Sequence, residues 1–266
     1  MRRANDRELE RILPYLKNNV KDCIYMYIDI AKYGVHNDFL EVWVNDGPEI
    51  DCVCMRYHTG FSVYTERENW PVDDVIRLIG EHDIRSITAR RDIAEALFDK
   101  LGAGCYELVT GSVFEFVKYH PMDLDIKVER AKTEDMMACA RLIAGDEAVG
   151  SYYDIDDLTD QLTERMNTGM GRNFIIRSGD EIIAHIASYA EYDGIATTSG
   201  LVVDPRNRNG LLGAYLEKHL VDALLADGFR IYTFITNRLR YRMLKTMGNP
   251  CVGEYGKLTR KVEGRD

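Results

Sequence analysis

The sequence has no long apolar run. No stretch of its 266 residues approaches the roughly 18 apolar residues of a membrane span, and none follows the polar N-terminus, so no secretory leader is indicated. Basic residues are also in deficit, because 34 Lys and Arg stand against 44 Asp and Glu, a formal charge of -10. This balance argues against a general nucleic-acid or anionic-membrane binder. We therefore expect a cytoplasmic protein with neither nucleic acid nor membrane as a partner.

Metal-binding patterns are also lacking. The six cysteines include no Cys-x-x-Cys pair and no Cys/His spacing that suits zinc. Cys52 and Cys54 are two apart on a predicted strand, so they share a face but lie about 7 Å apart, too far for a disulfide. We expect buried free thiols and no metal.

Prolines are few, and one group of residues around a proline divides the chain. There are six prolines, and Pro121 to Asp125 forms a short polar stretch that is the best candidate for a domain boundary. The composition, 45% hydrophobic and 29% charged, is that of a globular protein with one large domain or two small ones. We expect domains at 1–122 and 123–266.

Hydrophobic periodicity predicts the same order of elements on both sides of this boundary. Each half is expected to hold two helices, three strands, then helix, strand, helix and strand. In the first half the helices fall within 7–33 and at 72–80 and 93–101, and the strands at 39–44, 50–57, 61–65, 84–88 and 106–119. In the second half the helices fall at 133–144, 155–166, 211–226 and 239–246, and the strands at 174–177, 181–189, 195–203, 230–236 and 251–261. This order indicates a duplicated α/β domain, although mixed α/β chains also repeat such orders by chance.

The two halves differ in the loop that follows their third strand. In the first half this loop, Glu66 to Pro71, carries two glutamates and a proline and no glycine. In the second half Arg206 to Gly213 carries two arginines and two glycines before a helix. A helix start presents unpaired N–H groups at the positive end of its dipole, so this second loop suits an anion such as phosphate. The alternative is a turn whose arginines are only solvated.

The segment from Val203 to Gly213 resembles the acyl-CoA loop of the GNAT superfamily of N-acetyltransferases. In that family a strand ending in Val-x-Pro is followed by Arg/Gln-x-x-Gly-x-Gly/Ala at a helix start. Arg208 falls on the Arg/Gln position and Gly213 on the last Gly/Ala position, while Leu211 replaces the middle glycine. Leu211 would either crowd the pyrophosphate or accompany a loop shifted by one residue, with Gly210 as its flexible position.

The resemblance extends over roughly residues 126–262. The strand at 231–236, followed by Asn237, resembles the family's next strand and its pantetheine contact. The segment from Leu244 to Asn249 resembles the Tyr-x-x-x-Gly-Phe segment, with Leu244 in place of the usual Tyr. The first half looks like a degenerate copy, as in tandem GNAT proteins. The resemblance thus implies two GNAT-like domains, each a mostly antiparallel mixed sheet flanked by helices, with acyl-CoA bound by the second.

The resemblance also implies which residues bind the co-substrate, which by analogy is acetyl-CoA. Pantetheine would insert between the third strand and the strand after the loop helix, and the pyrophosphate would meet the loop. The implied contacts are Leu201, Val202, Val203, Arg208, Asn209, Gly210, Leu211, Leu212, Gly213, Ala214, Asn237 and Tyr241. For Asn237 the alternative is a helix N-cap.

Acyl transfer to an amine needs a base for the amine proton and a donor for the departing thiolate. Glu191 and His185, on the expected meander and its turn, are the candidate bases, although a solvated turn carboxylate and a core histidine are the commoner situations. Tyr241, one helical turn before Leu244 on the same face, is the candidate acid. No pattern for a covalent intermediate is found, so direct attack in a ternary complex is the simpler mechanism.

We therefore expect an acyl-CoA-dependent N-acyltransferase that acts on a small primary amine, as a monomer or homodimer. The alternatives are a non-catalytic acyl-CoA-binding or sensor module and a scaffold in which neither half binds CoA.

Overall fold

The chain forms two compact units in a computed structural model that describes residues 1–146, 150, 154–208 and 211–261. The first unit consists of Met1–Val113, Phe234–Tyr241 and Cys251–Asp266, and the second of Phe114–Thr233 and Arg242–Pro250. Neither unit is a continuous stretch, because Phe234–Tyr241 and the C-terminal segment both belong to the first unit. The division therefore does not follow the sequence halves 1–122 and 123–266.

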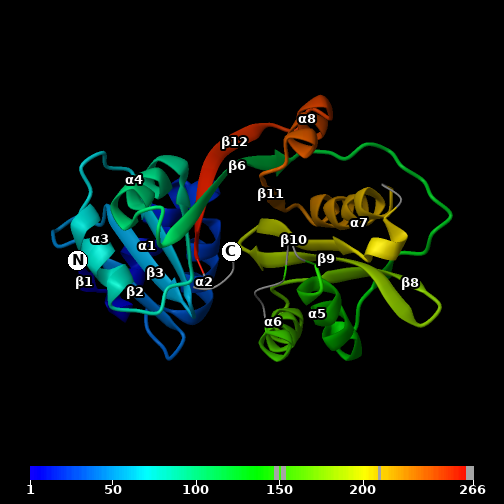
Figure 1. The fold of residues 1–266 in the computed structure, drawn as a ribbon, viewed down its shortest axis with the longest axis horizontal. Coiled ribbons are helices and arrows are strands. Elements are labelled where there is room, and N and C mark those ends of the chain that lie inside the picture. The colour runs from blue at the N-terminus through cyan, green and yellow to red at the C-terminus, as the bar shows by residue number, and fades with distance from the viewer. Residues whose placement is uncertain (147–149, 151–153, 209–210, 262–266) are drawn as a thin grey trace. The chain divides into compact units, whose positions relative to one another are not determined.

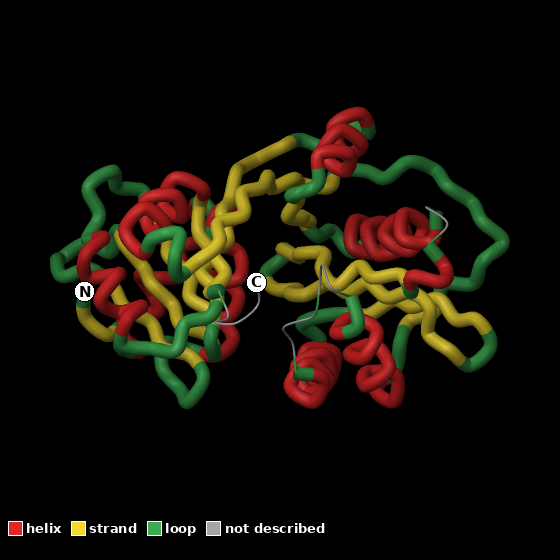
Figure 2. Tube along the Cα trace, in the orientation of Figure 1, coloured by secondary structure: helices red, strands yellow, loops and turns green. Residues whose placement is uncertain are grey.

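The predicted order of elements is confirmed in both halves, and the protein is an α/β protein with mostly antiparallel strands (Figures 1 and 2). The first half contains β1 (Arg2–Arg3), η1 (Asp6–Glu8), α1 (Leu9–Asn18), η2 (Val20–Asp22), α2 (Ile24–Tyr33), β2 (Leu40–Val44), β3 (Cys52–Tyr57), β4 (Gly60–Thr65), α3 (Val72–Gly80), β5 (Ser86–Arg90), α4 (Arg91–Leu101) and β6 (Tyr106–Phe116).

The second half contains β7 (Glu129–Arg130), η3 (Thr133–Asp135), α5 (Met136–Ala144), α6 (Ile155–Asn167), β8 (Asn173–Ser178), β9 (Glu181–Tyr192), β10 (Ile195–Val203), η4 (Pro205–Asn207), α7 (Leu212–Ala226), β11 (Arg230–Ile235), α8 (Arg238–Thr246) and β12 (Cys251–Arg260). Each half opens with a strand of two residues, β1 or β7, that was not predicted. Two residues carry no hydrophobic period from which a strand could be inferred.

The sheet of the first unit has the strand order β1-β2-β3-β4-β5-β12. β2, β3 and β4 are antiparallel neighbours, β4 and β5 are parallel, and β12 pairs antiparallel with β5 from Tyr255 opposite Arg90 to Thr259 opposite Ser86. Leu258 of β12 is fully buried in the same core as α3, α4 and β5. The C-terminal strand therefore completes the hydrophobic core of the N-terminal unit.

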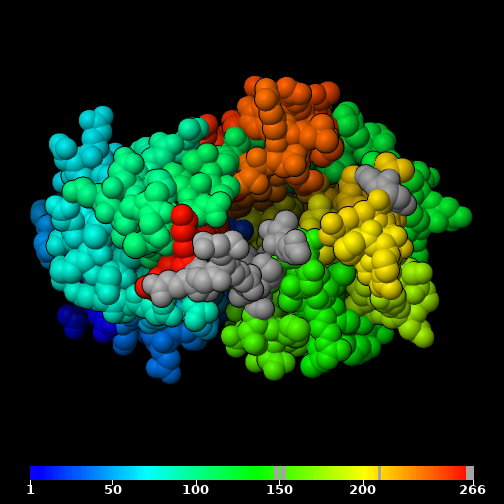
Figure 3. Space-filling model, viewed as in Figure 1, coloured from blue at the N-terminus to red at the C-terminus, as the bar shows by residue number. Residues whose placement is uncertain are grey.

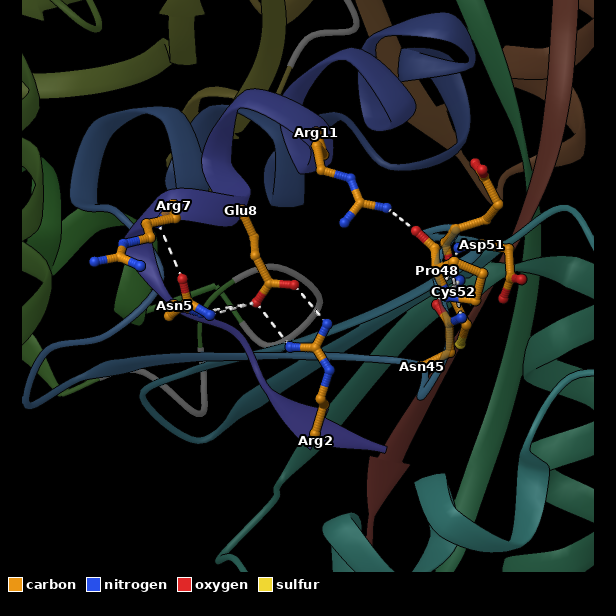
Figure 4. A network of polar contacts seen from close by, with 10 residues as sticks. Arg2, Asn5, Arg7, Glu8, Arg11, Asn45, Pro48, Asp51 and Cys52 are labelled. Carbon is orange, nitrogen blue, oxygen red and sulfur yellow. Dashed lines mark hydrogen bonds and ion pairs between the residues drawn. The ribbon is translucent and has the colours of Figure 1, made fainter.

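A polar network joins the start of the chain to the first helices (Figure 4). Arg2 donates two hydrogen bonds to the Glu8 carboxylate, at 2.6 and 2.8 Å, and the backbone N–H of Asn5 donates another at 3.1 Å. Glu8 is buried, and its pKa is lowered chiefly by the Arg2 guanidinium. A buried carboxylate needs such partners, so this network anchors β1 beside α1.

The second unit has three layers. Its sheet has the order β11-β10-β9-β8-β7, with β10 and β11 parallel and the other neighbours antiparallel. Helices α5 and α6 cover one face, and α7 covers the other (Figure 1). The core between the sheet and α5–α6 is apolar, and it includes Met136, Ile143, Leu158, Ile175 and Val202.

The cysteines are free thiols, as the sequence predicts. Cys23, Cys52, Cys54 and Cys139 are buried, whereas Cys105 and Cys251 are exposed, contrary to the expectation of burial. Cys105 precedes β6 and Cys251 opens β12, and the ends of strands lie where the sheet reaches solvent.

Candidate functional site

Strands β10 and β11 of the second unit pair over only part of their length. Their parallel ladder runs from Ile195 opposite Arg230 to Thr197 opposite Tyr232. β10 continues to Val203, so residues 198–203 follow the end of this ladder. An extended ligand can pair with a strand edge of this kind through main-chain hydrogen bonds, as a further strand does.

The equivalent strands of the first unit stay together almost to the end. β4 and β5 pair from Gly60 opposite Ser86 to Val63 opposite Ala89, and β4 ends at Thr65. Only residues 64–65 of β4 follow the ladder. The longer segment that follows the end of a ladder, the divergence of β10 from β11, lies in the half whose sequence predicts acyl-CoA binding.

A bulge in β10 accompanies the divergence. The register of β10 with β9 shifts between Thr197 and Thr198 and again between Ser199 and Val202. Between these residues, Gly200 has φ +64°, a left-handed conformation that glycine adopts without the strain a Cβ would add. Bulges of this kind bend a strand and increase its twist, which is what separates β10 from β11.

His185 holds this bulge from the neighbouring strand. It is fully buried on β9, and its Nδ1 lies 2.9 Å from the carbonyl oxygen of Gly200, while Nε2 lies 2.9 Å from the side chain of Asn173. Burial lowers the pKa of His185 to about 4, so the ring is neutral at pH 7. This is the environment of a core histidine that positions the backbone.

Thr197 occupies the last rung of the ladder between β10 and β11. Its side chain is fully buried, and its hydroxyl oxygen has no hydrogen-bond partner among the residues that the structure describes. An unpaired buried hydroxyl costs free energy. A polar group placed beside the end of this ladder would satisfy the hydroxyl.

The start of α7 supplies donors for an anion. The first intrahelical bond runs from the N–H of Tyr215 to the carbonyl of Leu211 at 2.9 Å, so the N–H groups of residues 212–214 precede any i−4 partner. Leu211 has φ -107° and is 50% exposed. Its backbone therefore does not need glycine, and leucine at this position causes no backbone strain. Asn209 and Gly210 lie outside the described residues.

Gly213 lies in the first turn of α7 against β10. A Cβ built on it would lie 3.5 Å from Val203 and 3.8 Å from Leu201, which are ordinary contact distances. Val202, between them, is buried in the core. The predicted residues 201–203 and 211–214 are therefore brought together by the packing of α7 on β10.

Both arginines of the loop are paired with carboxylates. Arg206 binds Asp204 and Glu181, at 2.7 and 2.5 Å, and its guanidinium lowers the pKa of Asp204 to about 2. Arg208 donates to the Val203 carbonyl at 2.9 Å and to Asp146 at 2.6 Å. Because these side chains are also about half or more exposed, phosphate would have to compete with the carboxylates for them.

Glu191, the other predicted base, is held by a guanidinium. Both its oxygens accept from Arg172, at 2.8 and 2.6 Å, and Ser188 donates to it as well. Arg172 also binds Asp227 at 2.6 Å. This clamp ties β9 to the end of α7, and it leaves the buried carboxylate fully engaged.

Asn237 and Tyr241 belong to the first unit. The side-chain oxygen of Asn237 accepts the N–H groups of Leu239 and Arg240, at 2.9 and 3.0 Å, so it caps α8 as the alternative predicted. Tyr241 is half-buried on α8, a helix at the surface of the molecule (orange in Figure 3). Leu244 is fully buried.

The described part of the chain contains neither a membrane-spanning helix nor a metal-binding cluster. No helix there is long and apolar enough to cross a membrane. No group of three or more His, Cys, Asp or Glu side chains in the same residues is arranged to hold a metal ion.

Comparisons with known proteins identify the fold. No family model matches the sequence, and no curated protein matches it. A GCN5-related N-acetyltransferase-like protein from Streptococcus suis 89/1591 is similar in structure, with a TM-score of 0.64 at 12% identity, over 97% of this chain and 100% of that one. A GCN5-related N-acetyltransferase from Sphaerobacter thermophilus has a TM-score of 0.64 at 13% identity, over 100% and 96%.

A tandem GNAT protein from the clavulanic acid biosynthesis pathway is also similar, with a TM-score of 0.61 at 12% identity, over 98% of this chain and 97% of that one. The chain therefore has the fold of the GNAT N-acetyltransferases, as the resemblance implied.

Three contributors to the site were not predicted. Asn173 holds His185, Asp146 holds Arg208, and Thr197 ends the ladder. Asn173 and Asp146 lie 12 and 62 residues from their partners, so no local pattern indicates them. Thr197 could have been noticed only if the length of the ladder were known.

Proposed function

We propose that the protein is an acyl-CoA-dependent N-acyltransferase, with acetyl-CoA as donor and a small primary amine as acceptor. The observation that carries the proposal is the divergence of β10 and β11 after Thr197 and Tyr232. An extended pantetheine chain fits beside residues 198–203, and its pyrophosphate fits the N–H groups at the start of α7. The GNAT fold supports the same assignment.

The proposed reaction is direct transfer in a ternary complex. The neutral amine attacks the thioester carbonyl, a C–N bond forms, the C–S bond breaks, and the thiolate takes up a proton. Holding both substrates together makes the attack effectively intramolecular. Tyr241 is the proposed proton donor to the thiolate.

The environments of His185 and Glu191 favour positioning roles for both side chains, not the role of base. His185 is enclosed by Gly200 and Asn173, and Glu191 by Arg172. The proposal therefore gives the amine proton to water at the open end of the divergence.

The central experiment measures acyl-CoA binding and thiol release. We expect acetyl-CoA to bind one site per chain by calorimetry, and a panel of amino acids, polyamines and aminoglycosides to reveal an acceptor through release of free CoA. Arg208→Ala is expected to raise the Michaelis constant for acetyl-CoA about tenfold, the equivalent of about 1.4 kcal/mol. Arg141→Ala, an exposed arginine on α5, is the matched control and should leave it unchanged.

An unchanged Michaelis constant in Arg208→Ala would refute the phosphate role of this arginine. Failure of both CoA and acetyl-CoA to bind would refute the proposed function as a whole. Tyr241→Phe is expected to lower kcat about a hundredfold with little change in acetyl-CoA binding. Unchanged turnover would remove Tyr241 from the mechanism.

A second candidate function is a non-catalytic acyl-CoA-binding or sensor module. The observation that favours it is Leu244, which stands at the position of the family's frequent tyrosine and is fully buried. Stoichiometric acetyl-CoA binding without thiol release across the amine panel would support this candidate over the enzyme.

A further inference from the structure

A pocket in the first unit carries chemistry that the proposed acyl transfer does not use. It lies between η2 and the start of α2 on one side and strands β4, β5 and β12 on the other, and its volume is about 30 Å³. A space of this size accommodates one or two groups as small as water or ammonium. Its charged lining residues are Lys21, Asp22 and Glu254, which gives a formal charge of one negative.

Asp22 brings a buried oxygen without a partner to this pocket. Its side chain is only 6% exposed, and Oδ2 accepts from the Lys21 ammonium at 2.6 Å. Oδ1 is buried and has no hydrogen-bond partner among the described residues. Leaving a carboxylate oxygen unsatisfied in the interior costs free energy, so a ligand that donates a hydrogen bond to Oδ1 would be stabilised.

Three aromatic rings line the same pocket. Tyr25 and Phe234 are stacked, with centroids 5.5 Å apart, and Phe234 meets Tyr255 edge to face at 5.0 Å. Burial raises the pKa of Tyr255 to about 12, so its ring stays neutral at pH 7. Aromatic faces attract a cation close to them, and a carboxylate beside such rings completes the chemistry of an ammonium site.

Two glycines make room for this arrangement. A Cβ on Gly253 would lie 3.1 Å from the Asp22 Oδ1, and a Cβ on Gly111 would lie 2.6 Å from the ring of Tyr255. Neither glycine has a positive φ, so their small size, and not their conformational freedom, is what the packing uses. The unpaired oxygen and the ring both depend on these missing side chains.

We propose that this pocket of the first unit binds the ammonium group of a small organic amine. The ammonium donates a hydrogen bond to the Asp22 Oδ1 and lies against the rings of Tyr25, Phe234 and Tyr255. The pocket recognises its occupant by the charge, the N–H donors and the small size of the ammonium group.

The experiment titrates the full-length protein with methylammonium, propylammonium and butylammonium chlorides by calorimetry and saturation-transfer NMR, in the absence of CoA. The expected result is saturable binding in about the millimolar range, an affinity that ligands of so few atoms can reach. Propanol, which is neutral, and tetramethylammonium, which has no N–H donor, should each bind at least about tenfold more weakly than propylammonium.

Two variants locate the binding. Asp22→Asn removes the charge and should weaken propylammonium binding at least about tenfold, while Gly253→Ala places a methyl group against Oδ1 and should weaken it similarly without changing any charge. Asp99→Asn, an exposed carboxylate on α4, is the matched control and should bind as the parent does. Circular dichroism checks the fold of each variant. If Asp22→Asn does not fold, the binding of propylammonium to Gly253→Ala is the test of the site.

The proposal is overturned if no alkylammonium ion binds saturably, in which case the pocket holds water only. It is equally overturned if propanol binds as well as propylammonium, or if Gly253→Ala binds as the parent does. Each result is independent of whether acetyl-CoA binds, so failure here leaves the proposed acyl transfer intact.

Discussion

His185 and Glu191 lie on the same strand, β9, and both are enclosed by protein groups. The sequence suggested them as bases because each can accept a proton near the end of the meander. A base must present a lone pair to the substrate, and here the available groups already make hydrogen bonds to Gly200, Asn173 and Arg172. At the scale of the residue, both side chains contribute to the shape of the site.

The first prediction concerns the pH dependence of stability that His185 causes. Its pKa in the folded state is about 4, against about 6.5 in the unfolded chain. Between these values only the unfolded state takes up the proton, so the free energy of unfolding falls on acidification from about pH 6.5 to about pH 4, by about 1.4 kcal/mol per pH unit. The contribution of the neutral His185 to the free energy of unfolding is fully present above about pH 6.5.

Denaturant unfolding at intervals between pH 7 and pH 4, for the parent and His185→Gln, measures this slope. The variant is expected to be less stable at pH 7 and to show a smaller loss across the interval. Equal slopes for the two proteins would mean that His185 is not the group responsible.

The second prediction separates a structural Glu191 from a catalytic one. Glu191→Gln places an amide beside the Arg172 guanidinium, which is only 11% exposed, so we expect a loss of about 3 kcal/mol in the free energy of unfolding. Turnover per folded molecule should be unchanged. Glu181→Gln breaks an ion pair in which both partners are more than half exposed and should cost less than about 1 kcal/mol.

Chemical denaturation of both variants measures the loss of stability, and thiol-release assays measure turnover. Full stability together with lost turnover in Glu191→Gln would return Glu191 to the role of base.

At the scale of the element, the two parts of β10 differ in their pairing with β11. Residues 195–197 close the sheet against β11, and residues 198–203 leave it. The change occurs where Gly200 adopts φ +64° and His185 binds its carbonyl. A strand with uninterrupted pairing, as β4 nearly has, offers much less free edge.

Gly200→Ala tests this reading of β10. A Cβ there would be strained by the positive φ and would lie 3.4 Å from His185, so we expect a loss of about 1–2 kcal/mol in stability and a Michaelis constant for acetyl-CoA raised about tenfold. Thermal unfolding and steady-state kinetics measure the two effects. Gly194→Ala is the matched control, because φ is +71° there but no atom lies within 4 Å.

The control should lose similar stability and keep its Michaelis constant. If both variants keep the parent's Michaelis constant, the bulge does not shape the proposed acyl-CoA site.

At the scale of the whole molecule, the last strand stabilises the unit in which the chain began. β12 pairs with β5 over five residue pairs and places Leu258 in the core of the first unit. Gly256 permits this packing, because a Cβ there would lie 2.4 Å from Ala94 of α4. The sheet and the core of the first unit therefore both require β12, the last strand of the chain.

Removal of β12 should destabilise the first unit. A chain ending at Pro250 exposes the edge of β5 and loses the core contacts of β12, and we expect the first unit to unfold well below the temperature of the parent. Leu258→Ala is the milder version, with an expected cost of about 3 kcal/mol. Circular dichroism on heating and hydrogen exchange of β5 measure both.

The control is a chain that ends at Lys261, which keeps the whole of β12 and should melt as the parent does. A chain ending at Pro250 that retained the parent's melting temperature and the exchange protection of β5 would contradict the structural role of β12.

The sequence by itself determined the local structure: the order of helices and strands in both halves, the strand that ends at Val203 and the helix that follows it, and, through its motif, the GNAT fold. These features depend on periodicity and turn residues within a few positions, and such signals are written along the chain. The tertiary structure alone decided that Glu181 pairs with Arg206 and Asp146 with Arg208, that His185 lies in the core, and that β12 belongs to the first unit. Each of these depends on residues far apart in sequence, whose contacts arise only when the sheets form.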